Sequence, residues 1–248
     1  MFRTGRRTSS SGNDGAHSHI ASSFTDLMAS LMVIFILLFM ATLSNAVAIR
    51  NNARDTTIET LLGALKSALA AGGMAEGGIR KDDRDPYAVV IVMPEDLLFK
   101  RGDWNVGDSG QRFLRIMIPL LSDIVCKGPL KTKVSNVVVE GHTDTTWSVV
   151  GGDGADGPQL NLGLSQQRSM DVVRWSLAAL EPGAERDCFR RLLSASGRGQ
   201  EELLPDVSGD DSRQRRVVFK IRTQRDAADD LATGLVNSVG TRSLEPGK

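Results

Sequence analysis

The sequence predicts a single transmembrane helix near the N-terminus, followed by an α/β sandwich domain built from βαβ units. The first observation is that residues 27–48 contain no charged side chain, and these 22 residues match the roughly 20 that a helix needs to cross a bilayer. The second is that, after residue 86, apolar runs typical of strands alternate with segments of helical periodicity. Together they indicate one membrane anchor and one globular domain.

Composition excludes several classes of function. The chain has 248 residues, 24% of them charged, and a net charge of zero, whereas a nucleic-acid binder needs surplus Lys and Arg to displace counterions. Of three histidines, His17 and His19 precede the apolar segment, so neither a metal cluster nor a nucleophilic triad has enough members. We therefore expect no enzymatic activity, no cofactor, no metal and no nucleic-acid partner.

The N-terminal part divides into a leader and a span. Residues 1–19 are basic and lack an apolar period, which predicts a disordered cytoplasmic leader, and residues 20–49 are predicted as the transmembrane helix. Basic residues before the span outnumber Arg50 and Arg54 after it, which favours a cytoplasmic N-terminus. We expect a single-pass protein of the bacterial inner membrane with its C-terminal domain in the periplasm.

A cleaved signal peptide is the alternative for this N-terminal part. The Arg-rich leader, the apolar core and Ala46-Val47-Ala48 imitate the three regions of such a peptide. The apolar core, however, is longer than the roughly 15 residues usual for a signal peptide, and Asp26 lies at its entrance. These two features favour a retained helix.

The rest of the chain divides into a connecting segment, a domain and a tail. Residues 50–86 are predicted as an amphipathic helix up to residue 71 and a linker, and the helix is either a plug or a plain spacer. The globular domain spans residues 87–223, and residues 224–248 are predicted as a mobile tail. Strands are predicted at 87–93, 134–140 and 217–221, and helices at 110–125, 165–180 and around Phe189.

Asp26 is the only formal charge within residues 20–49. An ionisable residue at mid-bilayer costs about 2.5–3.5 kcal/mol and therefore faces protein or an aqueous path. This favours an ion relay, for protons rather than sodium, in which Ala29 and Ser30 allow partner helices to approach closely. The alternative is a capping box in which Ser23 and Asp26 satisfy free amides at the start of the helix.

A carboxylate and a guanidinium follow at the ends of predicted elements. Asp144 closes the run Glu-Gly-His-Thr-Asp after a strand, and Arg168 closes Leu-Ser-Gln-Gln-Arg at the start of a helix. Such a pair can bind a zwitterion. Asp144 would accept a hydrogen bond from a ligand ammonium, and Arg168 would donate two hydrogen bonds to a ligand carboxylate. The alternative is a direct ion pair between the two side chains.

Cys126 and Cys188 are the two cysteines of the chain. In an oxidising periplasm they can form a disulfide, and the alternative is a pair of buried free thiols. The sequence leaves both states open.

This set of residues resembles the OmpA-like peptidoglycan-binding domain over roughly residues 87–222. The resemblance implies that Asp144 and Arg168, with Thr143 and Asn161 beside them, bind the diaminopimelate of the peptidoglycan stem peptide. The matching motifs are Leu97-Leu98-Phe99, Glu-Gly-His-Thr-Asp144, Asn161-x-x-Leu-Ser-x-x-Arg168, Ser196-Gly-Arg-Gly199 and Arg215-Arg216-Val217.

An OmpA-like domain behind one retained helix with an intramembrane aspartate resembles the MotB family of stator subunits. The lead-in Ser-Phe-Thr-Asp26-Leu-Met-Ala-Ser is most similar to the ZorB group, found in Zorya anti-phage defence systems. This resemblance implies a homodimer inside a ring of a multi-span MotA-like or ZorA-like partner, with Asp26 as the proton-carrying carboxylate. A flagellar-type MotB subunit and a passive cell-wall tether are the alternatives.

Overall fold

The computed structural model describes residues 14–73, 78–100, 102–146 and 157–225. Most of the predicted leader and of the predicted tail therefore lies outside the described residues. The chain divides into two compact units, Met1–Ala53 and Arg54–Lys248.

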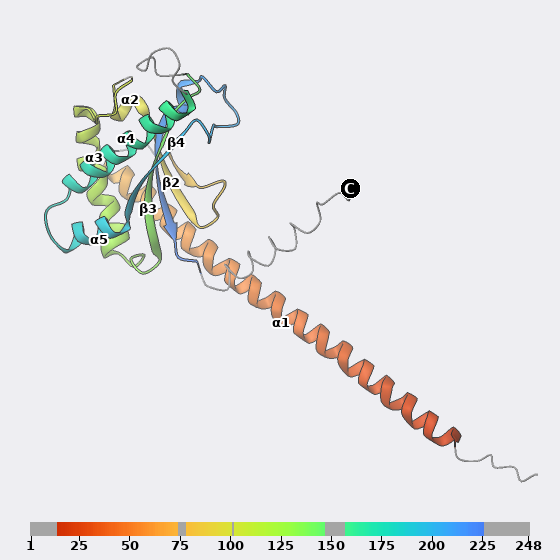
Figure 1. Ribbon diagram of the computed structural model, residues 1–248. Helices are drawn as coiled ribbons and strands as arrows, with labels where there is room; N and C mark the ends of the chain where they lie inside the picture. Colours follow the sequence, from red (N-terminus) through yellow and green to blue (C-terminus); the bar gives the residue numbers. More distant parts are fainter. Residues whose placement is uncertain (1–13, 74–77, 101, 147–156, 226–248) are drawn as a thin grey trace, which may run out of the picture. The chain divides into compact units, whose positions relative to one another are not determined.

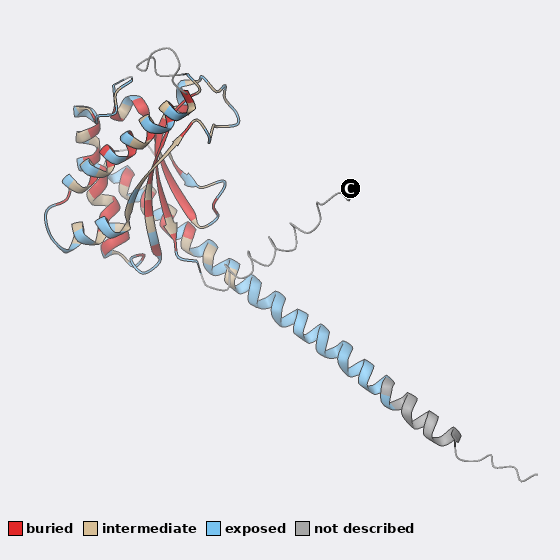
Figure 2. Ribbon diagram, in the orientation of Figure 1, coloured by how far each residue is buried: buried red, intermediate tan, exposed pale blue. Residues whose placement is uncertain are grey.

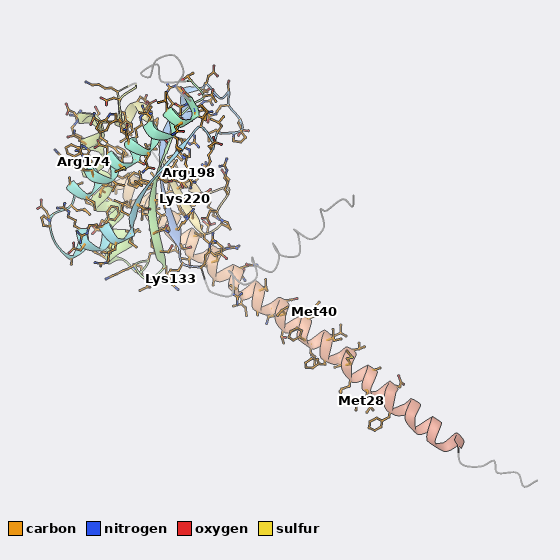
Figure 3. The ribbon with its side chains drawn as sticks, in the orientation of Figure 1. Met28, Met40, Lys133, Arg174, Arg198 and Lys220 are labelled. Carbon is orange, nitrogen blue, oxygen red and sulfur yellow. A yellow bond between two sulfur atoms is a disulfide. The ribbon has the colours of Figure 1, made fainter. Side chains whose placement is uncertain are left out.

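The first unit contains the N-terminal part of helix α1, which runs from Asp14 to Ala71. The helix begins six residues before the predicted start, and it includes both the predicted transmembrane helix and the predicted amphipathic helix. Large apolar side chains from Phe24 to Ile49 are 46–67% exposed, and Figure 2 shows this stretch as exposed throughout. Figure 3 shows Met28 and Met40 among them. By length and composition, α1 fits a single membrane span.

The last turns of α1 belong to the second unit. Ile58, Leu61, Leu65 and Leu69 are at most 3% exposed and lie in the same hydrophobic core as the inner face of the sheet. A plain spacer has no such buried stripe. The predicted amphipathic helix is therefore an integral part of the α/β domain.

The domain is built on a five-stranded sheet in the order β1-β2-β5-β3-β4. β3 and β4 are parallel and are connected through α4 and α5, which corresponds to a predicted βαβ unit, whereas the other neighbours are antiparallel. Strands β1 and β4 were not predicted. The strands are β1 (Ile79–Lys81), β2 (Ala88–Pro94), β3 (Val134–His142), β4 (Leu193–Gly199) and β5 (Arg216–Thr223).

Helices cover one face of this sheet, as Figure 1 shows for α3, α4 and α5. On β3 the buried Val137 and Val139 face these helices, so Glu140 and His142 point to the opposite, outer face. The helices are α2 (Glu95–Leu98), α3 (Asp108–Ser122) with the π-helical turn η2 (Asp123–Lys127), α4 (Gly157–Ala178), α5 (Ala184–Leu192) and the 3-10 turn η3 (Ser212–Gln214).

A disulfide joins two helical segments, and a glycine allows a helix to approach the sheet closely. Cys126 of η2 forms a disulfide bond with Cys188 of α5, with Cα atoms 6.0 Å apart. Of the two states that the sequence left open, the structure therefore has the disulfide. Gly141 of β3 lies so close to α4 that a Cβ atom there would be 2.3 Å from the carbonyl oxygen of Ser165. This contact brings the start of α4 against the end of β3.

Candidate functional site

Asp144 lies just beyond the end of β3, and local hydrogen bonds hold it there. The amide of Thr143 donates to the carbonyl of Gly199 at 2.9 Å, which extends the pairing with β4. One carboxylate oxygen of Asp144 accepts from the amide of Thr146 at 3.0 Å and from the Thr146 hydroxyl. Asp144 is 2% exposed, so its charge requires partners within the protein.

Arg168 comes from α4 and is 3% exposed. Its Nε donates to the carbonyl of Asp103 at 2.9 Å, and its guanidinium lies 5.2 Å from the ring centroid of Phe99. Its ionic partner is Glu95, the first residue of α2. Among the described residues, the direct Asp144–Arg168 ion pair considered from the sequence is not formed.

Arg215 connects the two predicted residues. Its guanidinium binds one oxygen of Glu95 and, through another nitrogen, one oxygen of Asp144. Glu95 binds Arg168 with its second oxygen. The result is an alternating row, Asp144–Arg215–Glu95–Arg168, which we call the charge ladder. Its two carboxylates and two guanidinium groups balance in charge.

Burial affects the two arginines of the charge ladder differently. Burial lowers the pKa of Arg168, against the opposing effect of Glu95. Burial also acts to lower the pKa of Arg215, but hydrogen bonds to Asp144 and Glu95 outweigh it, and the pKa is raised. Arg168 therefore depends on a nearby negative charge, which Glu95 supplies in this structure.

The two further predicted residues have different positions. Asn161 is buried, and its amide nitrogen donates to the carbonyl of Asp144 at 3.2 Å and to Gln200 at 3.1 Å, so it positions the Asp144 backbone. The hydroxyl of Thr143 is buried and has no hydrogen-bond partner within the described part of the chain. A buried hydroxyl without a partner next to Asp144 calls for a further hydrogen-bond partner, such as a water molecule or a ligand.

A cavity of about 280 Å³ opens beside the charge ladder. Glu95 and Arg215 line it, so they are the first ladder groups that a ligand in the cavity meets. Sequence reasoning missed Glu95 and noted Arg215 only as part of a motif. Their positions could have indicated both residues as candidates, because Glu95 directly follows one strand and Arg215 directly precedes another. The lining residues are Pro94, Glu95, Asp96, Phe99, Ser212, Arg213 and Arg215.

Asp26, the predicted ion relay, lies in the exposed part of α1. Because α1 begins at Asp14, Asp26 is not in its first turn, and the capping-box interpretation of Ser23 and Asp26 is wrong. On the following turn, the hydroxyl of Ser30 donates to the carbonyl of Leu27 at 2.9 Å, which satisfies it within the helix. Asp26 is thus an exposed carboxylate at the start of a long run of exposed apolar side chains.

Comparison with known proteins identifies the fold of the second unit. No protein-family model and no curated protein matches the sequence. The structure is similar to that of a putative MotB-like protein from Desulfovibrio vulgaris, with a TM-score of 0.52 and 22% identity over 70% of this chain and 99% of that one.

Two further solved structures have lower scores. The periplasmic domain of Helicobacter pylori MotB has a TM-score of 0.44 and 18% identity over 64% of this chain and 90% of that one. The cell wall anchor of the type VI secretion system (T6SS) from Pseudomonas aeruginosa has a TM-score of 0.42 and 20% identity over 66% of this chain and 97% of that one.

The first of these structures shows the fold. The chain combines one long apolar helix with an α/β domain that has the fold of a MotB-like protein. The predicted fold class, a single N-terminal helix followed by an α/β domain of this kind, is confirmed.

Proposed function

We propose that this chain is the peptidoglycan-anchored subunit of a proton-driven stator of the MotB type, in the form of ZorB from Zorya anti-phage defence systems. In this proposal α1 spans the inner membrane with its N-terminus in the cytoplasm, and the α/β domain lies in the periplasm. Two copies of the chain stand inside a ring of a multi-span, MotA-like or ZorA-like partner. The chain has no enzymatic role.

The observation that carries the proposal is that Asp26 is the only charged residue in the apolar part of α1, residues 20–49. Asp26 is not in the first turn of α1, and among the described side chains of this helix none forms an ion pair with it. A single helix cannot enclose an ion path, so the partner ring must supply the remaining walls. Protonation of Asp26 from one side and its release to the other would couple ion flow to movement of the ring.

The charge ladder supports the wall-binding half of the proposal. A zwitterion such as diaminopimelate carries the same two kinds of charge that the ladder already pairs. Its carboxylate can replace Glu95 at Arg168, and its ammonium can replace Arg215 at Asp144, while Glu95 and Arg215 remain paired with each other. The site thus binds by exchange of partners, and no charge is left buried alone.

The ion-relay role is tested by replacing Asp26 with Asn in the full chain, expressed with its partner and the neighbouring genes. We expect loss of phage protection and of proton influx in proteoliposomes, with an unchanged amount of chain in the membrane. Asp55→Asn is the matched control, because Asp55 lies in the same helix and pairs with Arg54 at the surface. Retained proton influx in Asp26→Asn would refute the ion relay.

Two cheaper observations bear on the same role. A neighbouring gene for a multi-span partner beside a helicase or nuclease supports the defence form, and a flagellar-type partner supports a motility stator. The mass of the mature chain shows whether the N-terminal helix has been removed as a signal peptide. If residues 1–48 are missing, only a passive tether remains.

The wall-binding role is tested by sedimenting the detergent-solubilised chain with purified peptidoglycan. We expect Asp144→Asn and Arg168→Gln to reduce binding at least about tenfold, since each removes one charge-assisted contact worth about 1.5–3 kcal/mol. Free diaminopimelate should compete with the wild-type chain. Asp187→Asn and Arg190→Gln are matched controls, because that pair is exposed on α5. Unchanged binding in both ladder variants would assign the ladder a purely structural role.

A further inference from the structure

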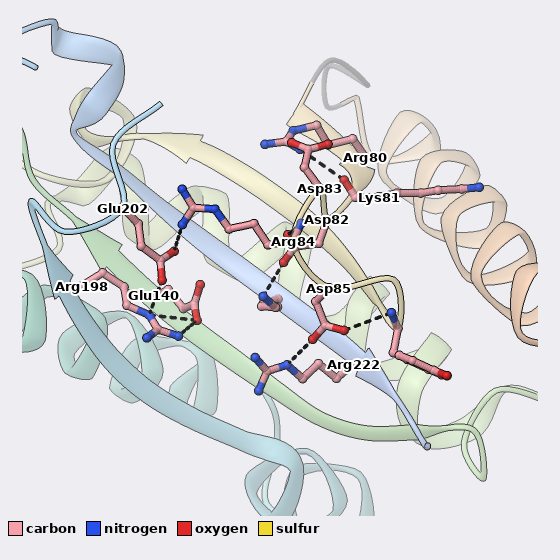
Figure 4. A network of polar contacts seen from close by, with 12 residues as sticks. Arg80, Lys81, Asp82, Asp83, Arg84, Asp85, Glu140, Arg198, Glu202 and Arg222 are labelled. Carbon is pink, nitrogen blue, oxygen red and sulfur yellow. Dashed lines mark hydrogen bonds and ion pairs between the residues drawn. The ribbon is translucent and has the colours of Figure 1, made fainter. Parts of the chain in front are cut away.

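A second cluster of chemically active side chains lies on the outer face of the sheet, away from the charge ladder. Glu140 and His142 are two residues apart on β3 and therefore point to the same side. Glu202, from the segment between β4 and β5, lies over them. One carboxylate oxygen from each Glu and one imidazole nitrogen all lie within 4.8 Å of one another. Figure 4 shows Glu140 and Glu202 facing each other across this surface.

The imidazole of His142 is unusual in this cluster. His142 is 3% exposed, and its Nδ1 is buried without a hydrogen-bond partner among the residues that the structure describes. Burial, with the nearby charges of Arg216 and Arg198, lowers the pKa of His142 to about 3. A metal ion would bind the neutral form of this ring.

We propose that Glu140, His142 and Glu202 form a binding site for a divalent transition-metal ion, with Zn²⁺ as its best probe. One imidazole nitrogen and two carboxylate oxygens suit an ion of borderline softness, and three protein ligands leave one position for water. Ligand atoms about 2.1 Å from such an ion lie about 3.4 Å apart. Because the three atoms lie within 4.8 Å of one another, an inward movement of at most about 1.4 Å brings them to this spacing, and side-chain rotation can supply it.

The cations around the cluster have to be accounted for. Arg198 binds Glu140 at 2.6 Å and Glu202 at 3.6 Å, and Arg84 binds Glu202 at 3.0 Å. The side chains of Arg198 and Arg84 are 35% and 59% exposed, so both can swing into solvent. A divalent ion supplies the same charge as the two guanidinium groups that it displaces, so the charge of the cluster is unchanged.

The two remaining cations stay in place. Arg216 donates to the carbonyls of Gln214 at 2.9 Å and of Glu202 at 2.8 Å, and Lys220 is paired with Asp82. A negatively charged ligand is disfavoured at this imidazole, because the oxygens of two carboxylates lie within 4.8 Å of the imidazole nitrogen and would repel it. The counting of histidines in the sequence did not consider this cluster, because Glu202 reaches it from a distant part of the chain.

A metal ion here would tie two segments of the wall-binding domain together. His142 is two residues before Asp144, and Glu202 lies in the connection that leads to Arg215. The ion would therefore restrain the two segments that lead to Asp144 and Arg215, without contacting the ladder itself. This role is independent of the proposed stator function.

The test is a Zn²⁺ titration of the full chain in detergent by isothermal calorimetry, after treatment with EDTA. The chain carries His17→Ala and His19→Ala so that His142 is its only histidine, and its cysteines are paired. We expect one Zn²⁺ per chain. Glu202→Gln should weaken binding at least about tenfold, since loss of even an outer-shell partner costs about 10–100-fold. Glu202 is half-buried in a loop, so this variant folds even if His142→Ala does not.

Two further variants distinguish the outcomes. Glu201→Gln, at the exposed neighbouring position, is the matched control and should bind like the parent chain. Arg198→Gln should bind Zn²⁺ more tightly, because it removes the competing cation. Absence of binding in the parent chain, equal affinity in Glu202→Gln and Glu201→Gln, or weaker binding in Arg198→Gln would each overturn the metal site.

Discussion

Gly141→Ala is expected to destabilise the domain strongly, because the new methyl group would meet backbone. Its Cβ would lie 2.3 Å from the Ser165 carbonyl oxygen and 3.0 Å from the carbonyl carbon. Carbon and oxygen in contact lie about 3.3 Å or more apart, so β3 and α4 must separate by roughly 1 Å. Overpacking of this kind lowers the free energy of unfolding by about 1–3 kcal/mol and sometimes more. Because rigid backbone lies on both sides of the new methyl group, we expect a loss of about 3 kcal/mol here.

Gly163→Ala is the matched control on the same helix. A Cβ there meets nothing within 4 Å, and Ala in a helix interior is about 0.5–1 kcal/mol better than Gly. The free energies of unfolding of the two variants should therefore differ by about 4 kcal/mol. With a urea slope of about 2 kcal/mol per molar, the unfolding midpoints differ by about 2 M.

Urea unfolding of both full-length variants, followed by circular dichroism, measures this difference. Peptidoglycan sedimentation should fall in Gly141→Ala, because a displaced α4 moves Arg168 relative to Asp144. Coincident midpoints for the two variants would refute the close approach of β3 and α4 that positions the charge ladder.

Three other predictions concern stability. Replacing Cys126 and Cys188 with Ser should cost about 4 kcal/mol, since the bond closes a loop of 62 residues, and a dithiothreitol-treated wild-type chain should unfold at the same urea concentration. Leu65→Ala should cost about 2–5 kcal/mol in the same assay, whereas a spacer helix would leave the midpoint unchanged. Glu95→Gln should cost about 3 kcal/mol by leaving Arg168 buried with its charge uncompensated, and an unchanged thermal melting temperature would contradict this.

Local patterns in the sequence predicted the long elements of the fold. The period of apolar residues between 58 and 69 predicted a helix, but it could not show that the helix packs into the domain core, because the partner surface is distant in sequence. β1 was missed because Ile79-Arg80-Lys81 is too short to show alternation. β4 was missed because Leu193–Gly199 is rich in Ser and Gly, and it is held as a strand by pairing with β3.

The candidate site was predicted in part for a similar reason. Asp144 and Arg168 were found from their positions at element ends and from the resemblance to the OmpA-like domain. Their ionic partners were not, because Glu95 and Arg215 reach them only through the antiparallel pairing of β2 with β5, where Pro94 lies opposite Arg216. A pairwise reading of Asp144 and Arg168 suggested a direct contact, whereas the fold inserts Arg215 and Glu95 between them.

The disulfide also limits how far the chain between Cys126 and Cys188 can be extended. Cys126 and Cys188 bracket the chain segment that carries Asp144 and Arg168. If tension between membrane and wall pulled the domain open, the shortest covalent route from Cys126 to Arg168 would run through Cys188, along roughly 20 residues rather than roughly 42. At about 3.5 Å per extended residue, the slack falls from about 150 Å to about 70 Å. In the proposed wall-anchoring role, the crosslink would therefore limit how far the segment that carries Asp144 and Arg168 can be extended.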